Sequence, residues 1–223
     1  ATVAVSTRYA WMWKRAPSYF DVVAYSGNGV SGQQIKHNLG VPPELTLIKN
    51  RGTSNNWLAL FYAGQLANSD GWQSSSAFSD ASSYMSSTFP NEATYFGVSA
   101  NGNAGASGNN YIAYLFASVA GVSKVGSYTG SSSGVVTVDC GFTSGARFVL
   151  IKRTDASGDW YVYDSVRGIN SSADDPYLLL NTIDAESTNT NNIEPHSSGF
   201  QLTQQGTNPI SINGGSYIFY AIA

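Results

Sequence analysis

One pattern occurs twice in this chain, and it constrains the fold more than any other feature. Residues 45–50 (LTLIKN) precede an apolar run at 57–61 (WLALF), and residues 148–153 (FVLIKR) precede a similar run at 160–164 (WYVYD). The shift between the two copies is constant at 103 residues (150 − 47 and 160 − 57). A constant shift is typical of a structural unit that is used more than once. We therefore expect a chain built from at least two copies of one unit.

Within each copy the pattern predicts β-strands. Both Ile-Lys runs are apolar on both faces before they become charged, which is typical of a strand inside a sheet. A Gly/Ser/Asn turn then leads into the Trp run, so the two runs form a hairpin. No amphipathic helix of useful length is present, because even residues 77–85 contain too many serines. The sequence predicts an all-β protein of two tandem, duplicated antiparallel β-sandwich-like units, and one large sandwich formed from both units is the alternative.

Three aromatic runs indicate where the units end. The runs at 111–117 (YIAYLFA) and 217–223 (YIFYAIA) each close a unit, and the run at 9–16 (YAWMWKRA) resembles them. We therefore predict that this first run is the closing strand of a preceding unit. Because the chain begins without Met, we also expect it to be processed or to be a piece of a longer protein. The expected organisation is a closing strand at 1–16, a first β unit at 17–117 and a second β unit at 118–223.

Composition excludes several classes of protein. Charged residues make up 11% of the chain, against about 25% in a typical globular domain. A net charge of −3 argues against a nucleic-acid partner or an anionic membrane surface. No run of 18 apolar residues is present, so we expect no membrane insertion. The single Cys140 excludes an intrachain disulfide and a cysteine-rich metal site.

The two histidines give little support for a metal site. His37 aligns with Cys140 of the other copy, so the shared frame does not need an imidazole there, and we expect a packing or turn role. His196 lies in a predicted polar loop, and a zinc site there would need carboxylate ligands. The acidic candidates lack the spacing of a calcium loop; they are Asp174, Asp175, Asp184 and Glu186. We predict no metal and no cofactor.

The acidic residues that could act in catalysis also have an explanation in local structure. A glycosidase needs two opposed carboxylates, which Asp155, Asp159 and Asp164 could supply. However, Asp155 and Asp159 flank a hairpin turn, where aspartate is favoured for turn geometry alone. Asp164 precedes Arg167 by three residues, which predicts a turn-fixing ion pair. With no nucleophile motif or phosphate loop in the chain, we predict that the protein is not an enzyme.

Two residue types recur at equivalent positions of the copies. Trp57 and Trp160 could form a sugar-stacking platform, but an identical residue in otherwise divergent copies more often packs the shared core, and we predict the core role. Lys49 and Lys152 are predicted to be strand-end lysines whose stems pack while their ammonium groups reach water.

The copies diverge in two long polar stretches, at 64–91 and 168–198. They exceed ordinary connections in length, so we expect short strands within them, at 71–78 and 177–181. Long polar loops on a rigid frame are where recognition usually occurs. The aromatic residues of these loops are the candidates for ligand contact: Trp72, Tyr84 and Tyr177.

A set of short motifs in the second unit carries a family resemblance. The motifs are 150–153 (LIKR), 160–168 (WYVYDSVRG), 177–181 (YLLLN), 185–186 (AE), 198–200 (SGF) and 215–219 (GSYIF). They resemble an uncharacterised repeat domain of tailed-bacteriophage virion proteins, especially tail fibres and related host-contact proteins of marine phages. Residues 11–17 (WMWKRAP) with 20–23 (FDVV) resemble the family's junction between units. The first unit departs from the pattern, since Phe61 and Gly64 stand where the second unit has Asp164 and Arg167.

The resemblance implies a function without catalytic residues. It implies a structural and adhesive module of a phage tail fibre or similar virion appendage, which presents polar loops for recognition of a host-surface glycan. The implied partners are other virion proteins and further copies of the chain, with a trimer favoured, and the implied location is the surface of the virion. Three alternatives remain open: a capsid- or tail-associated decoration protein without a ligand, a carbohydrate-binding module, and a polysaccharide depolymerase.

Overall fold

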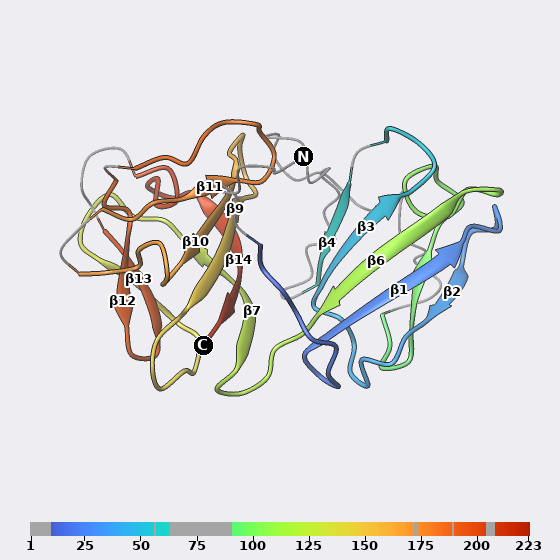
Figure 1. Cartoon of the computed structure of the whole chain (residues 1–223), viewed down its shortest axis with the longest axis horizontal. Helices are drawn as coiled ribbons and strands as arrows, with labels where there is room; N and C mark the ends of the chain where they lie inside the picture. The colour runs from blue at the N-terminus through green and yellow to red at the C-terminus, as the bar shows by residue number, and fades with distance from the viewer. Residues whose placement is uncertain (1–9, 56, 63–90, 172–173, 189, 204–207) are drawn as a thin grey trace, which may run out of the picture.

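A computed structural model of the chain describes residues 10–55, 57–62, 91–171, 174–188, 190–203 and 208–223. The described residues form fourteen β-strands and no helix (Figure 1). All pairs of neighbouring strands run antiparallel. The all-β prediction is therefore confirmed.

The first half of the chain folds into two sheets. The larger one, which we call the first main sheet, has the strand order β1-β6-β3-β4. Its strands are β1 (Phe20–Ser26), β6 (Asn110–Phe116), β3 (Leu45–Asn50) and β4 (Leu58–Phe61). The smaller sheet pairs β2 (Gln33–Lys36) with β5 (Tyr95–Val98). A buried cluster that includes Ile35, Phe96 and Tyr111 fills the space between the two sheets.

The second half repeats this arrangement with two additional strands. Its larger sheet, the second main sheet, has the order β11-β10-β9-β14-β7. Its strands are β11 (Leu178–Leu179), β10 (Trp160–Asp164), β9 (Phe148–Arg153), β14 (Ser216–Ile222) and β7 (Ser123–Thr129). The facing sheet has the order β12-β13-β8, formed by β12 (Ile193–His196), β13 (Gly199–Leu202) and β8 (Val136–Asp139). A second buried cluster, including Tyr163, Phe200 and Phe219, lies between them.

The two halves have the same topology, as the repeat predicts. The order β1-β6-β3-β4 corresponds strand by strand to β7-β14-β9-β10, and the pair β2-β5 corresponds to β8-β13. Three strands begin 103 residues after their counterparts (123 − 20, 136 − 33 and 148 − 45). The expectation of tandem, duplicated antiparallel sandwich-like units is therefore confirmed.

A third core joins the halves, because the two main sheets face each other (Figure 1). We call this apolar layer the seam. Its buried members come from both main sheets: Phe20, Leu45, Leu47, Ala59, Phe61 and Phe116 from the first half, and Val125, Phe148, Leu150, Trp160, Val162, Ile218 and Tyr220 from the second. The inner strands of each main sheet are thus buried on both faces, which explains why β3 and β9 are buried along almost their whole length, whereas the edge strands β1 and β7 keep exposed residues.

The N-terminal segment does not form the strand that the sequence predicts. Residues 10–15 belong to no sheet, and Ala16 makes only an isolated bridge to Phe20. The segment instead runs between the two halves, as the dark blue trace in Figure 1 shows. Trp11 and Trp13 pack against the seam, whereas Met12 is 94% exposed. The predicted strand over 9–16 is therefore wrong for the described residues, and so is its burial on both faces.

Two further local predictions can be compared with the structure. The polar loop expected around His196 is the strand β12, which pairs with β13. The strand expected at 177–181 is present in short form as β11, which pairs with β10 through Tyr161 and Val162. The strand expected at 71–78 lies outside the described residues.

Candidate functional site

Trp11 and Trp13 of the N-terminal segment pack against the seam. Charged residues of the second half lie beside them at the surface. The ring of Trp13 meets Phe116 of the first half at 6.2 Å and Phe148 of the second half at 5.6 Å, both edge to face. Such contacts contribute about 0.5–1.5 kcal/mol beyond the area that they bury. Trp13 therefore links both main sheets.

Trp11 is held by a charged network of the second half. Its indole Nε1 donates a hydrogen bond of 3.2 Å to Oδ2 of Asp164. The same carboxylate oxygen accepts from Nε of Arg167 at 2.7 Å, and Arg167 also binds Glu186 at 3.0 Å. The guanidinium carbon of Arg167 lies 5.5 Å from the centre of the Trp11 ring, within the range of a cation–π contact. These contacts fix the position of the Trp11 ring against the end of β10.

The electrostatics of this network favour ionised groups. Burial of the Asp164 carboxyl group opposes its ionisation, but the hydrogen bonds and charge of Arg167 outweigh this effect, so the pKa of Asp164 lies below its ordinary value. Backbone N–H groups of Val166 and Arg167 donate to the other carboxylate oxygen, at 3.1 and 3.0 Å. The Asp164–Arg167 ion pair fixes the turn after β10, as the sequence predicts, and both oxygens of Asp164 accept hydrogen bonds from neighbouring groups.

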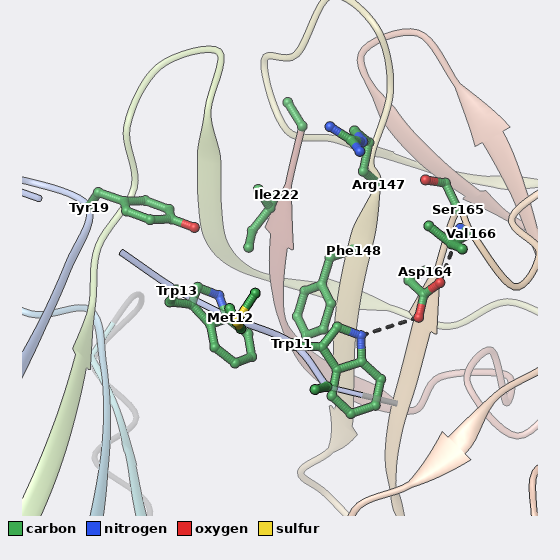
Figure 2. A pocket seen from close by; sticks show the side chains of 12 residues that line it. Trp11, Met12, Trp13, Tyr19, Arg147, Phe148, Asp164, Ser165, Val166 and Ile222 are labelled. Atoms are coloured by element: carbon green, nitrogen blue, oxygen red, sulfur yellow. Dashed lines mark hydrogen bonds between the residues drawn. The ribbon is translucent and has the colours of Figure 1, made fainter. Parts of the chain in front are cut away.

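A surface pocket of about 380 Å³ opens beside this network (Figure 2). We call it the seam pocket. Its apolar wall includes Trp11, Trp13 and Phe148, and its polar end includes Arg147 and Ser165. Figure 2 shows the two tryptophans and Met12 on one side, with Arg147 and Ser165 at the far end. The pocket thus brings aromatic rings and a cation together at the junction of the two halves.

A second hollow, of about 430 Å³, lies deeper in the seam. It shares Trp11, Trp13 and Phe148 with the seam pocket, and Trp57 and Tyr114 also line it. The two tryptophans of the N-terminal segment and Phe148 of β9 therefore lie between the two hollows.

The carboxylates considered for glycoside hydrolysis have structural partners. Asp155 accepts two hydrogen bonds from Arg153, at 2.9 and 3.1 Å, and one from the Ser216 N–H at 2.9 Å. The hydrogen bond from Arg153 lowers the pKa of Asp155 to about 2. Asp159 accepts from the side-chain amide of Asn181 at 2.8 Å.

The paired positions His37 and Cys140 are both buried. Nδ1 of His37 accepts from the Leu39 N–H at 3.2 Å, so Nε2 carries the proton and donates to the Glu92 carbonyl at 3.1 Å. Burial lowers the pKa of His37, and burial raises the pKa of the Cys140 thiol to about 12. The packing and turn role expected for His37 agrees with this geometry.

Asp175 is an acidic residue whose side chain lies inside the fold. It is fully buried, and its carboxylate accepts from the backbone N–H groups of Asn192 and Ile193, both at 3.1 Å. Burial raises its pKa to about 6, despite these hydrogen bonds.

Within the described part of the chain, no three His, Cys, Asp or Glu side chains are grouped closely enough to hold a metal ion.

The repeated lysines differ from the prediction in one respect. Lys152 donates to the Gly158 carbonyl at 2.7 Å, and Lys49 donates in the same way to the carbonyl of Asn55, six residues ahead in both cases. Lys49 is half-buried, but Lys152 has no exposed surface, so the expectation that its ammonium reaches water is wrong. The lysine bridges the hairpin from inside, which explains why both copies have it.

The repeated tryptophans both belong to the seam. Trp160 is 1% exposed and is part of the buried cluster. Trp57 is half-buried and stacks on Tyr114 with ring centres 5.9 Å apart. The predicted packing role fits these surroundings, since both residues pack in the seam.

The loop aromatics can be placed only in part. Trp72 and Tyr84 lie outside the described residues. Tyr177 is half-buried and contacts Tyr161 and Tyr163, with ring centres 5.2 and 5.6 Å apart. It anchors its loop to the core of the second half.

Sequence reasoning did not identify the residues of the seam pocket. Trp11 and Trp13 were assigned to a strand, and Arg147 and Ser165 had no motif to single them out. One signal in the sequence could have pointed to Arg147. It is a cation directly before the apolar run 148–153, and the equivalent position of the first copy has an acid instead, Glu44 (147 − 103).

Comparison with known proteins gives one match, to a family whose description is "Domain of unknown function (DUF7483)", over residues 10–223. The chain belongs to the DUF7483 family. The matched span begins with the N-terminal segment, so the family domain comprises this segment together with both halves. No curated protein and no solved structure matches the DUF7483 chain. None of its described residues forms a helix that could cross a membrane.

Proposed function

We propose that this DUF7483 chain is a structural and adhesive module of a phage tail fibre or similar virion appendage. Its role is to present a surface that recognises a glycan of the host cell. The resemblance of its motifs to tailed-phage virion proteins supports the proposal, as does a rigid frame in which the inner strands of each main sheet are buried on both faces.

The observation that carries the adhesive role is the contrast between the carboxylates and the seam pocket. Asp155, Asp159 and Asp164 are each engaged by hydrogen bonds that fix a turn or a hairpin. The seam pocket, by contrast, offers aromatic rings and a solvent-exposed arginine. Aromatic walls with a few convergent polar groups are typical of a binding site. This arrangement favours recognition over catalysis.

Immunogold electron microscopy on particles of a phage that encodes the domain tests the proposal. Antibodies raised against the purified domain are expected to label the tail fibres or the tail tip. Labelling of the capsid would instead favour the decoration-protein alternative. Particles that contain the other virion proteins but no label, and no peptides of the domain by mass spectrometry, would overturn the proposal.

We also propose that the chain assembles with copies of itself, with a trimer favoured, because the tail fibres that its motifs resemble are usually symmetric trimers. Sedimentation equilibrium of the purified chain is expected to give a mass about three times the 23.7 kDa of the monomer. A monomer mass over the full concentration range would overturn this part of the proposal.

A carbohydrate-binding module without a virion is the second candidate, and the aromatic lining of the seam pocket favours it. The two candidates share the binding chemistry and differ in location. Immunogold labelling therefore separates them, whereas a glycan-binding assay does not.

A further inference from the structure

The seam pocket has a polar end that no structural contact uses. Arg147 and Ser165 are both exposed. They lie on adjacent segments of the backbone, since the Ser165 N–H donates to the Arg147 carbonyl at 2.9 Å. Among the described residues, neither the guanidinium of Arg147 nor the hydroxyl of Ser165 has a hydrogen-bond or ion-pair partner. The polar end therefore has donors that no described residue engages, on two exposed residues that line the pocket (Figure 2).

The backbone under these groups is rigid, which makes the end suitable for recognition. The Arg147 N–H donates to the Ile222 carbonyl at 2.7 Å, so the residue is held between the ends of β14 and β10. Asp164 also lines the pocket, but its carboxylate is ion-paired with Arg167 at 2.7 Å, which offsets its negative charge. It therefore does not pair with Arg147, and the guanidinium remains available to a ligand.

The opposite wall is apolar and aromatic. Trp11 and Trp13 are half-buried, so part of each indole is accessible from the pocket. The rim carries two of the most exposed large apolar side chains of the described residues, Met12 at 94% and Val166 at 87%. The face of an indole ring is electron-rich and attracts the polarised C–H groups of a sugar ring. The volume of about 380 Å³ is at the lower end of small-ligand sites, which suits one or two sugar rings.

We propose that the seam pocket binds a sugar ring that carries a carboxylate, such as a uronic or sialic acid of a host-surface polysaccharide. The carboxylate is bound by the guanidinium of Arg147, with the Ser165 hydroxyl as a further donor, because arginine matches the planar geometry of a carboxylate. The C–H face of the ring packs against Trp11 and Trp13. The proposal rests on the adhesive function above and names its ligand class.

Affinity for a single sugar is expected to be weak, with a Kd on the order of 1 mM, because a small ligand offers few contacts. Such a value is sufficient for an appendage with several copies, since simultaneous binding of linked sites raises the overall affinity by roughly 100-fold or more. The attraction between charges also predicts that binding weakens as salt concentration rises.

The test uses the full chain and three acidic probes, namely galacturonate, glucuronate and N-acetylneuraminate. Galactose and glucose are the uncharged controls for the two uronates. Binding is followed by the ¹H–¹⁵N signals of the indole groups of the five tryptophans. At least one acidic probe is expected to shift the signals of Trp11 and Trp13 in a saturable way, and to leave the signal of the buried Trp160 in place.

Matched variants make the test specific. Arg147→Gln is expected to weaken binding by about tenfold or more, since it removes a charge-assisted pair. Arg51→Gln is the control, because Arg51 is also an exposed arginine but does not line the pocket. It is expected to bind the probe like the unmodified chain.

Three results would overturn the proposal. They are the absence of saturable shifts with all three acidic probes, equal binding of the uncharged sugars, and shifts confined to Trp72 of the divergent loop. None of these results bears on whether the domain is part of a virion, so failure here is distinguishable from failure of the proposed function.

Discussion

Replacement of Trp13 by alanine tests how strongly the N-terminal segment joins the two halves. The half-buried indole packs edge to face on Phe116 and Phe148, which belong to different main sheets. If the ring buries roughly 120 Å² of apolar surface, about 25 cal/mol per Å² gives a loss of about 3 kcal/mol in the free energy of unfolding. This is at the lower end of the range of about 3–5 kcal/mol for a fully buried tryptophan, as expected for a partly exposed ring.

Urea unfolding followed by far-ultraviolet circular dichroism measures this loss, with an unchanged slope if the variant unfolds in the same way. Met12→Ala is the matched control in the same segment, because Met12 is 94% exposed and its truncation should cost less than about 0.5 kcal/mol. A loss below about 1 kcal/mol for Trp13→Ala, or equal losses for both variants, would refute the packing argument.

Three further changes have defined outcomes. Trp11→Phe removes the indole donor to Asp164 and should lower the free energy of unfolding by about 1–2 kcal/mol in urea titrations; no loss would show that this hydrogen bond is not stabilising. Burial lowers the pKa of His37 in the fold, so the unfolded chain binds the proton more readily and stability should fall as the pH drops below 6.5. The His37→Asn variant should lose that part of the slope between pH 7 and pH 5, and an identical slope in both proteins would contradict the assignment. Gly199→Ala would place a Cβ atom 2.2 Å from the Val138 carbonyl oxygen, so the free energy of unfolding in urea should fall by about 1–3 kcal/mol, and an unchanged free energy would exclude this close approach.

The repeat explains why much of the frame could be predicted from the sequence. Recurrence of Lys49 as Lys152 and of Trp57 as Trp160 identified the hairpins, because both copies preserve the residues that pack or bridge them. The ion pair of Asp164 could also be predicted, since its partner lies three residues away on the same turn. Local patterns thus identified local contacts.

The seam could not be predicted, because its contacts join residues that are far apart in the sequence. Trp11 and Trp13 alternate with exposed residues, as in a half-buried strand, but alternation does not show whether a hydrogen-bonding neighbour exists. The partner of the Trp11 indole is 153 residues away, and Arg147 lines the pocket because the distant N-terminal segment packs against the second half. The full burial of Lys152 is likewise not evident from its position at the end of a strand.

The central claim is that two duplicated sandwiches and the N-terminal segment form one cooperative domain through a shared seam. Native-state hydrogen exchange tests it most directly, because it reports the free energy of opening for amides in each half separately. Amides of β6 in the first half and of β14 in the second should exchange with the same free energy, and Trp13→Ala should lower both equally. A loss confined to one half, or different free energies for the two strands in the unmodified chain, would contradict the claim.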